Sequence, residues 1–487
     1  MRRSSFARVL QHCTAALVAG AAAACSDRPT PVEPAVRVAV RPTVGTVAVV
    51  ADTANALQLV VHFTVSAADS ARVLYRRGTN AEQASRALTV TDSASVPLLA
   101  VQPGTSVTAR VVAFRGAATD TSAPVSATNT AAVPDVVRRV RFATTTGHAS
   151  PGYLLTAVEI GDTSYAVAFD STGTVAWYRQ FAGVPGAIDA YQQPNGDVTV
   201  FLGSSASNPL AIGKFAEVRP GGTLVREWAA PSGFSTDPHE LRLDAGAGSS
   251  SYVFGFDSAP MDFTARGGTA DSSVVGHTIF RLDATGAATS IFVARDHFTV
   301  ADWIDPEQGI TDFDHPNAID VDRDGGLIIS WRNFDEVSKI DPVTGQFVWR
   351  LGGRHNQFTF VNDPLNGFGG QHFARLLANG NLLLYDNGTT HAPQETRAAE
   401  YRLDLGAHTA TLVWQFRHQP TIFTPYVGST QRLASGHTFI GYAGVGIATE
   451  VTSAGAVVWE GQLTLDGNNA QVYRLLKIAA LGHYAAP

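Results

Sequence analysis

Three histidines occupy matching places in a series of short apolar segments. They are His239, His315 and His372, and each lies at or near the start of a segment of strand-forming residues. A histidine in such a place can bind a metal, transfer a proton or act as a nucleophile. The remaining histidines are most simply interpreted as ordinary surface or core residues: His62, His148, His277, His297, His355, His391, His408, His418, His437 and His483.

An arginine accompanies these histidines. Residues 312–317 contain His315, and the next apolar segment ends in Ser330-Trp331-Arg332-Asn333. Antiparallel neighbours bring the start of one strand and the end of the next to the same sheet edge, so we expect Arg332 beside His315. Three imidazoles alone would suit zinc or another divalent metal. A guanidinium beside them favours an oxyanion such as sulfate or phosphate, unless Arg332 forms only a surface ion pair.

The segments that must position these residues form a repeat. Each unit has an apolar strand, an Asp or its equivalent, a turn that usually contains Gly, and an apolar strand that usually ends in Trp. Six units fit, and they close on Trp177, Trp228, Ile291, Trp349, Trp414 and Trp459. Helical periodicity is nearly absent. We therefore predict an all-β fold whose residues 134–487 form a six-bladed β-propeller.

The repeat is offset at its two ends. The first unit lacks a clear opening strand, whereas residues 471–476 have the form of one but belong to no unit of their own. We expect this C-terminal strand to complete the first blade and close the ring, which removes open sheet edges. The first strand of each blade lines the channel of a propeller, so His239, His315 and His372 would meet at the channel mouth.

Two further regions precede the repeat. Residues 37–133 contain alternating strands at 57–65, 72–75 and 107–114, and residues 99–105 resemble a fibronectin type III domain, so we expect a small fibronectin type III-like β-sandwich. Residues 1–25 begin with arginines, continue with small and apolar residues and end at Cys25.

That first segment resembles a bacterial lipoprotein signal peptide, although Ala22 stands where Leu is typical, and an ordinary secretory signal is the alternative. We expect lipidation of Cys25, a Pro-rich tether over residues 26–36, and an exported protein that is periplasmic or anchored to the outer membrane.

Composition narrows the classes of function. The formal net charge is -7 and no basic run is present, so we expect no nucleic-acid partner. Of the two cysteines, Cys13 lies in the removed segment and Cys25 becomes the mature N-terminus. No thiol would remain for a disulfide or a thiolate metal site. Beyond the N-terminus no apolar run reaches membrane-spanning length, so a membrane would be contacted only through the lipid anchor.

Several motifs in combination resemble one enzyme family. They are residues 312–317 with 330–333, then 339–353, 370–375 and 383–388. Together they resemble the bacterial arylsulfotransferases that do not use the nucleotide sulfate donor. The resemblance covers residue 134 to the C-terminus. It implies a six-bladed propeller after an N-terminal β-sandwich, no cofactor, and transfer of a sulfuryl group from a phenolic sulfate donor to a phenol acceptor.

The resemblance assigns a role to each matching residue. It makes His372 the nucleophile, which carries the sulfuryl group as a sulfohistidine between two half-reactions in ping-pong order. It implies that His315 and Arg332 stabilise the transferring group and that Asn317 binds it. The remaining histidine of the family matches His239, which would transfer the phenolic proton.

Three positions depart from the family pattern. Pro238 replaces a histidine before His239, Asn333 stands where a histidine commonly follows the arginine, and Phe373 stands where a small polar or acidic residue often follows the nucleophile. These changes bear on substrate preference more than on the type of reaction.

A protein of another class is also compatible with the repeat. Residues 341–349 resemble the tryptophan-docking repeat of quinoprotein propellers and of outer-membrane assembly scaffolds. A non-catalytic ligand- or protein-binding propeller would share the fold, but it would not need the histidines and Arg332 to converge. A quinone-dependent dehydrogenase would need calcium-binding carboxylates and often adjacent cysteines, and those cysteines are missing. The sequence leaves a homodimer open.

Overall fold

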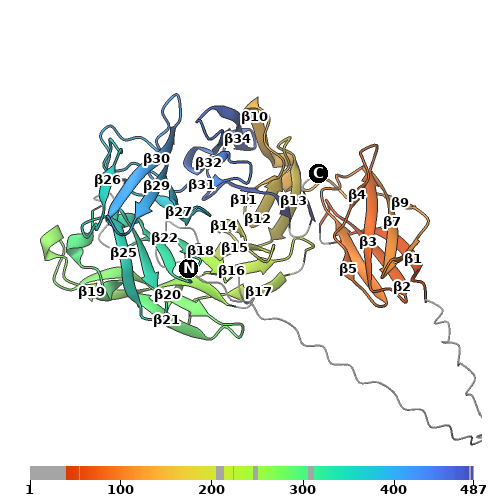
Figure 1. The fold of residues 1–487 in the computed structure, drawn as a ribbon, viewed down its shortest axis with the longest axis horizontal. Helices are drawn as coiled ribbons and strands as arrows, with labels where there is room; N and C mark the ends of the chain where they lie inside the picture. Colours follow the sequence, from red (N-terminus) through yellow and green to blue (C-terminus); the bar gives the residue numbers. More distant parts are fainter. Residues whose placement is uncertain are drawn as a thin grey trace, which may run out of the picture. The chain divides into compact units, whose positions relative to one another are not determined.

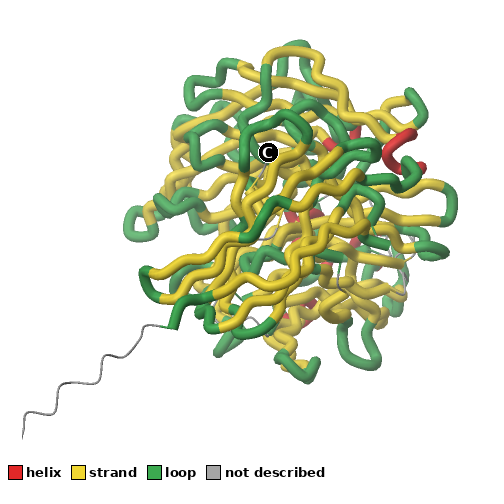
Figure 2. Tube along the Cα trace, turned by 90° about the vertical axis from the view of Figure 1, so that its right-hand side faces the viewer, coloured by secondary structure: helices red, strands yellow, loops and turns green. Residues whose placement is uncertain are grey.

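A computed structural model of the protein describes residues 40–53, 55–203, 213–222, 224–244, 250–304, 312–481 and 484–485. The expected signal peptide, the tether and the lipidation site Cys25 lie outside the described residues. The prediction of an all-β protein is confirmed: strands dominate, and Figure 2 shows helix only as short red segments. Among the described residues, no helix has the length and apolar character needed to cross a membrane.

The N-terminal region is built from two antiparallel sheets. Alternate residues of their strands, among them Val61, Phe63, Val107 and Val111, are buried in one shared hydrophobic core. The first sheet contains β1 (Thr43–Ala51), β2 (Leu59–Ser66) and β6 (Ser93–Leu98). The second contains β3 (Ser70–Arg77), β4 (Gln83–Ala84), β5 (Leu88–Thr89), β7 (Ser106–Arg115), β8 (Ala118–Thr121) and β9 (Val125–Thr128). A short helix, α1 (Asp135–Arg139), follows.

The described residues from Val140 to Ile478 build six further sheets in chain order (Figure 1). The first contains β11 (Tyr153–Ile160), β12 (Thr163–Phe169), β13 (Val175–Phe181) and β36 (Leu476–Ile478). The second contains β14 (Ala187–Gln192), β15 (Val198–Gly203), β16 (Gly213–Val218) and β17 (Leu224–Trp228). The third contains β18 (Ser235–Leu243), β19 (Ser251–Met261), β20 (Ser272–Leu282) and β21 (Ala288–Val293).

The remaining three sheets follow the same order. The fourth contains β22 (Pro316–Val321), β23 (Leu327–Trp331), β24 (Glu336–Asp341) and β25 (Gln346–Gly352). The fifth contains β26 (Thr359–Val361), β27 (His372–Leu376), β28 (Leu382–Asp386), β29 (Arg397–Asp404) and β30 (Thr409–Arg417). The sixth contains β10 (Val140–Gly147), β31 (Ser429–Arg432), β32 (Thr438–Tyr442), β33 (Ile447–Val451), β34 (Val457–Leu465) and β35 (Asn468–Asn469).

Short elements connect or follow these sheets. They are the 3₁₀ helices η1 (Thr264–Arg266), η2 (Ala294–Asp296), η3 (Val300–Asp302), η4 (Arg332–Phe334) and η5 (Ala443–Val445), and the terminal hairpin of β37 (Ala480–Leu481) and β38 (Tyr484–Ala485). The opening strands β14, β18, β22, β27 and β31 contact one another in succession, and β31 contacts β36. They therefore surround a common centre.

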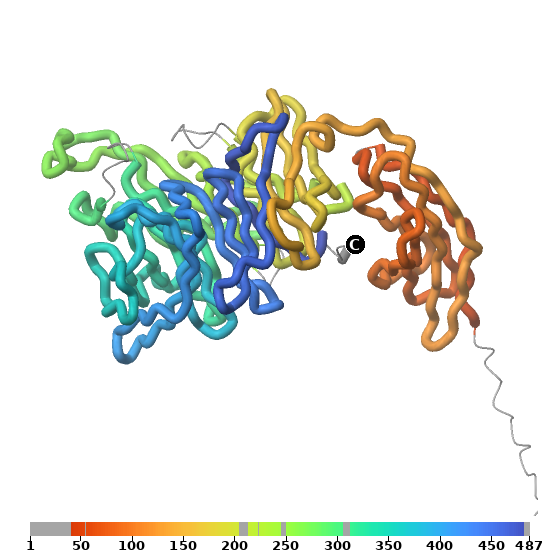
Figure 3. The backbone as a smooth tube through the Cα atoms, turned by 90° about the horizontal axis from the view of Figure 1, so that it is seen from above, coloured from red at the N-terminus to blue at the C-terminus, as the bar shows by residue number. Residues whose placement is uncertain are grey.

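Both ends of the repeat region complete sheets begun elsewhere. The C-terminal β36 pairs with β11, and β10 pairs with β34 as an extra edge strand. Figure 3 shows the blue C-terminal segment beside the yellow and orange segment that begins this region. The bounds that we expected for the C-terminal strand, residues 471–476, are wrong, because β36 begins only at Leu476. The preceding residues leave the sheet and direct Arg474 into buried ion pairs with Asp189 and Glu240.

Two tryptophans of the repeat connect neighbouring sheets. The indole N–H of Trp177, in β13, donates to the backbone oxygen of Pro220 at 2.8 Å, in the turn before β17. Trp414, in β30, donates in the same way to the oxygen of Ser453 at 2.9 Å. These two closing strands, β13 and β30, are thus each tied to a turn of the following sheet by a hydrogen bond of about 1 kcal/mol net.

Candidate active site

The opening strands are irregular where they approach the centre. The pairing register shifts in β14, β18, β22 and β27, and each shift marks a β-bulge or similar irregularity. Two site residues beside these shifts have left-handed backbone, His315 with φ 45° and Phe373 with φ 53°. A bulge turns side chains out of the regular alternation, so these strands can aim residues at the centre that a flat strand would bury in the sheet.

His372 is the first residue of β27 and is held in one orientation. Its Nδ1 lies 2.7 Å from Asn387 Oδ1 and 3.0 Å from the oxygen of Gly370. The Asn387 amide is itself fixed, because its Nδ2 donates to the oxygens of Thr424 and Val427. Both neighbours of Nδ1 are acceptors, so Nδ1 carries the hydrogen and Nε2 carries the lone pair. The Val427 N–H lies 3.3 Å from that Nε2.

The surroundings of His372 keep it uncharged. Burial, and then the positive charge of Arg332, hold the pKa of His372 well below its usual range. His315 and His239 act on it in the same direction, so all three side chains lie within electrostatic reach of His372. A buried neutral imidazole whose Nε2 lone pair accepts only the long hydrogen bond from Val427 can act as a nucleophile near neutral pH.

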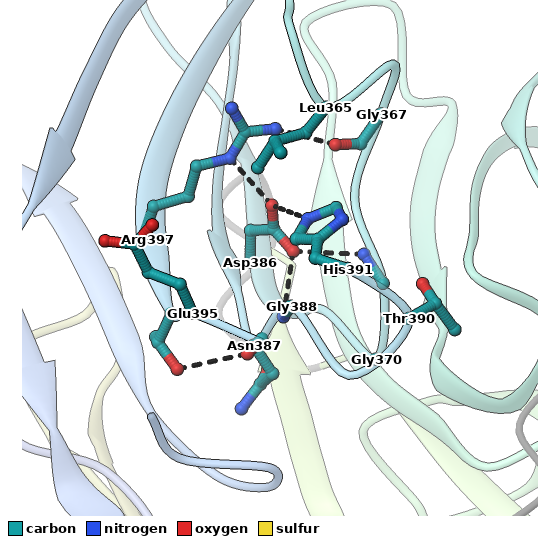
Figure 4. Close-up of polar contacts among 12 residues, drawn as sticks. Leu365, Gly367, Gly370, Asp386, Asn387, Gly388, Thr390, His391, Glu395 and Arg397 are labelled. Carbon is teal, nitrogen blue, oxygen red and sulfur yellow. Dashed lines mark hydrogen bonds and ion pairs between the residues drawn. The ribbon is translucent and has the colours of Figure 1, made fainter. Parts of the chain in front are cut away.

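A framework of ion pairs supports this orientation. Asp386 accepts the N–H groups of Gly369 and Gly388 at 3.0 Å and pairs with Arg397 at 2.8 Å and His391 at 2.9 Å (Figure 4). These contacts hold the loop before β27 and the segment that carries Asn387.

Two further side chains fix the start of β27. Asp335 accepts the Gly370 N–H at 2.6 Å. Gln371 donates to the oxygens of Trp331 at 3.2 Å and Glu336 at 3.0 Å, in the neighbouring sheet. In the pair Gln371-His372, Gln371 therefore anchors the start of β27 and His372 belongs to the site.

His315 lies immediately before β22 rather than within it. Its Nδ1 faces Asp312 Oδ2, and its backbone N–H donates to Asp314 Oδ1 at 3.0 Å. The ring is half-buried and lies 4.5 Å, centroid to centroid, from the ring of His239. The two histidines thus form a pair at the centre, as the repeat predicted.

His239 lies in β18 and is oriented by a carboxylate. Its Nδ1 is 2.9 Å and 3.1 Å from the two oxygens of Asp237, and its backbone N–H also donates to Asp237 at 2.9 Å. Burial lowers the pKa of His239, and Asp237 offsets this only in part. The hydrogen faces Asp237, so the other ring nitrogen, Nε2, is the basic one.

Arg332 follows β23 and is buried, with 2% of its surface exposed. The alternative of a surface ion pair is therefore wrong. Its Nη1 donates to Asn333 Oδ1 at 2.9 Å, its Nη2 lies 3.2 Å from the oxygen of Pro425, and its backbone N–H donates to His315 at 3.1 Å. Asn333 also donates to the oxygen of Asp312 at 2.8 Å. Asn333 thus positions both the guanidinium and the loop before His315.

Asn317, in β22, is fully buried and connects two opening strands. Its Nδ2 donates to the oxygen of Gln371 at 2.8 Å, directly before His372. An amide nitrogen carries two hydrogens, so one donor remains for a substrate oxygen.

Sequence reasoning missed two side chains at the centre, Tyr473 and His277. The ring of Tyr473, just before β36, lies 5.5 Å from that of His239 and 6.5 Å from that of His372. His277, in β20, contacts the carboxylates of Asp237 and Asp314. The three carboxylates at positions 237, 312 and 314 were the available signal for His277, because buried anions need a positive partner.

Phe373 has a different environment from His372. The guanidinium carbon of Arg375 lies 4.0 Å from the centroid of its ring and that of Arg474 lies 4.9 Å away. Both arginines pair with the buried Glu240. This aromatic and ionic packing surrounds the residue that directly follows His372.

The arrangement combines a neutral nucleophile, a buried guanidinium and two imidazoles with oriented protons. It suits transfer of an anionic group through charge stabilisation and proton transfer. Among the residues that the structure describes, no group of three or more His, Cys, Asp or Glu is arranged to hold a metal ion.

Comparison with known proteins gives one family. Residues 260–464 match the family model described as "Arylsulfotransferase (ASST)". The matched residues include His315, Asn317, Arg332 and His372, whereas His239 lies before them. None of the curated proteins matches the chain.

Similar solved structures are distant. A protein of unknown function from Bacteroides caccae has 16% identity and a TM-score of 0.41, over 68% of this chain and 99% of that one. A putative 6-phosphogluconolactonase from Bacteroides fragilis has 13% identity and a TM-score of 0.36, over 68% and 98%. A streptogramin B lyase has 10% identity and a TM-score of 0.34, over 68% and 100%. Likenesses at this level carry no argument about function.

Proposed function

We propose that the protein is an aryl sulfotransferase, a proposal supported by the match of residues 260–464 to the arylsulfotransferase family model. It moves a sulfuryl group from a phenolic sulfate ester to a phenol, through a covalent sulfohistidine on His372. The observation that carries the proposal is the state of His372. Its Nδ1–H is committed to Asn387 and Gly370, and its pKa is held low, so a lone pair on Nε2 is available in a buried, positively charged surrounding.

In the first half-reaction His372 Nε2 attacks sulfur in line with the departing oxygen. A bond forms between nitrogen and sulfur, the bond between sulfur and the aryl oxygen breaks, and its electron pair leaves with the phenolate. Little covalent assistance is needed, because such transfers depend mainly on positioning and on stabilising charge on the equatorial oxygens. Three groups support that stabilising role: the buried guanidinium of Arg332, the ring of His315 and the remaining N–H of Asn317.

In the second half-reaction an acceptor phenol attacks the sulfohistidine. The phenolic proton passes to His239 Nε2, the phenol oxygen bonds to sulfur, and the electron pair of the nitrogen–sulfur bond returns to His372. The proton taken by His239 balances the one that the first phenolate acquires. Asp237 supports this role, because it stabilises the imidazolium that forms. The reaction requires no cofactor.

The test is transfer itself. The mature protein is mixed with an aryl sulfate and a phenol acceptor, and release of the donor phenol is followed while the acceptor is varied. Parallel lines in a double-reciprocal plot, and donor phenol released without any acceptor, would support ping-pong transfer. Failure to release donor phenol from every aryl sulfate tried would favour the alternative of a binding propeller.

We also propose the architecture and the location that accompany this activity. Six consecutive sheets whose opening strands contact one another, closed by β36 and β10, support a six-bladed propeller. The two sheets before it, with one shared core, support a fibronectin type III-like sandwich. Export and lipidation at Cys25 rest on the N-terminal sequence.

A further inference from the structure

His277 occupies a position where two carboxylates meet. It lies in β20, the third strand of its sheet, and only 4% of its side chain is exposed. Its Nδ1 is 2.5 Å from Asp314 Oδ1, and its Nε2 is 3.1 Å from Asp237 Oδ2. A carboxylate offers only acceptors, so both ring nitrogens must carry hydrogen. The contacts therefore identify His277 as an imidazolium.

The surroundings of His277 stabilise its positive charge. Burial opposes it, but Asp314 and Asp237 outweigh burial and raise the pKa of His277 well above its ordinary value. The rings of Phe254 and Phe256 lie 6.5 Å and 5.6 Å from its own. Because these apolar rings displace water, the ion pairs are stronger than they would be at the surface.

Asp237 divides its charge between two histidines. One of its oxygens lies 2.9 Å from His239 Nδ1, while the other lies 3.1 Å from His277 Nε2. A cation already bound to this carboxylate reduces the stabilisation that Asp237 can give to a second cation. The positive charge of His277 therefore disfavours protonation of His239, and it acts in the same direction as burial.

We propose that His277 is a positioning residue, an imidazolium bridging Asp237 and Asp314 that keeps His239 uncharged, with its Nε2 lone pair ready to take the phenolic proton. This inference rests on the proposed function. Asp314 extends the arrangement, because it also accepts the backbone N–H of His315. One buried cation thus fixes two carboxylates: Asp237, which orients the ring of His239, and Asp314, which holds the backbone of His315.

The inference has a direct consequence for pH. His239 can accept a proton only while it is neutral, so the rate of the second half-reaction falls as the pH drops below the pKa of His239. Removal of the His277 charge frees Asp237 to stabilise protonated His239 and raises that pKa. The acidic limb of the rate profile must then move to higher pH. The titratable groups that face His239 are Asp237 on its own strand and, from other elements, His277, Asp312, His315, His372 and Tyr473.

The first experiment does not depend on activity. Histidine-labelled protein is titrated by NMR, and the signals of residues 239 and 277 are assigned by substitution. In the wild type, His277 should stay protonated at both nitrogens over the range in which His239 titrates, and His239 should be the Nδ1–H tautomer. In His277→Gln the titration of His239 should move up by about 1 pH unit.

The second experiment measures the transfer. His277→Gln should shift the acidic limb of acceptor turnover upward by about 1 pH unit, so that at any pH well below both limbs the rate falls about tenfold. His277→Lys, which retains a cation, should return the limb toward its wild-type position. The matched control is His297→Gln. That histidine stacks on Phe292 at 4.1 Å and has no role in the site, so its variant should keep the wild-type limb.

The outcomes separate the two proposals. If the wild type transfers no sulfuryl group but His239 still titrates higher in His277→Gln, the proposed function fails and the positioning role stands. If His277 is neutral in the wild type, or if neither the titration nor the limb moves in His277→Gln, the positioning role is refuted. A variant that does not fold leaves the wild-type protonation of His277 as the deciding measurement.

Discussion

Two buried histidines of the site, His372 and His277, have pKa values that are shifted in opposite directions. On one side burial, and then the positive charge of Arg332, hold the pKa of His372 well below the usual range, although the hydrogen bond to Asn387 acts in the opposite direction. On the other side His277 lies between two carboxylates, and its pKa rises. Burial disfavours a charge on both rings. The presence of carboxylates beside His277, and of a guanidinium near His372, therefore decides which histidine is a fixed cation and which is neutral.

The largest effect is expected where the nucleophile itself is removed. His372→Ala should lose both half-reactions, with a fall in turnover of at least about 10⁴-fold. Mass analysis after mixing with donor alone should show a sulfo adduct on His372 in the wild type and none in the variant. Turnover in His372→Ala, or transfer only through a ternary complex, would show that His372 is not the nucleophile.

A smaller effect is expected on the other side. His239→Ala removes the proton acceptor and should slow turnover by roughly 10²–10⁴-fold. A donor with a good leaving group should partly rescue the first half-reaction, because its phenolate leaves without a proton. If donors with good and poor leaving groups lost turnover equally, His239 would not be the residue that transfers the proton.

One substitution can make the surroundings of His372 resemble those of His277. Asn387→Asp puts a carboxylate against His372 Nδ1 and should raise the pKa of His372, because the protonated ring gains an ionic partner. Attack requires the neutral ring, so the acidic limb of donor turnover should move to higher pH. At a pH well below both limbs the rate should fall about 10- to 100-fold.

The control for that variant is Asn366→Asp, which adds the same charge at an exposed position. Its donor turnover should keep the wild-type pH profile. A profile in Asn387→Asp that matches this control would mean that the amide of Asn387 does not set the protonation of His372.

A substitution in the N-terminal segment should have little effect on the reaction at His372 or at His239. Cys25→Ser should change turnover by less than about twofold, since the proposed chemistry uses no residue of the N-terminal segment. It should, however, abolish incorporation of a labelled fatty acid that the wild type takes up. Equal labelling of both proteins would refute the lipid anchor and favour an ordinary secretory signal.

Repeat position predicted part of the site well. His239, His315 and His372 share a place in the repeat, and the structure brings them within electrostatic reach of one another. Arg332 was expected beside His315 from the antiparallel order of two strands, and its backbone does contact His315. These residues were accessible because the repeat itself determines which strand ends meet.

The rest of the site depends on departures from the repeat. His277 comes from a third strand, which a regular sheet would keep away from the centre, and it reaches Asp314 from the following sheet. Tyr473 and Arg474 come from a segment that leaves the expected strand. The bulges in β18, β22 and β27 shift the alternation of side chains, and sequence spacing does not reveal such shifts.

The pairing of β36 with β11 also affects the order of events during synthesis. A ribosome reaches Tyr473 and β36 only at the end of the chain, long after His372 has emerged. Until then β11 lacks its partner strand, and the space between His239 and His372 lacks its tyrosine ring. A nascent chain, or one cut short before residue 471, should therefore contain the nucleophile without a finished site. The proposed activity can therefore begin only after β36 has been made and has paired with β11.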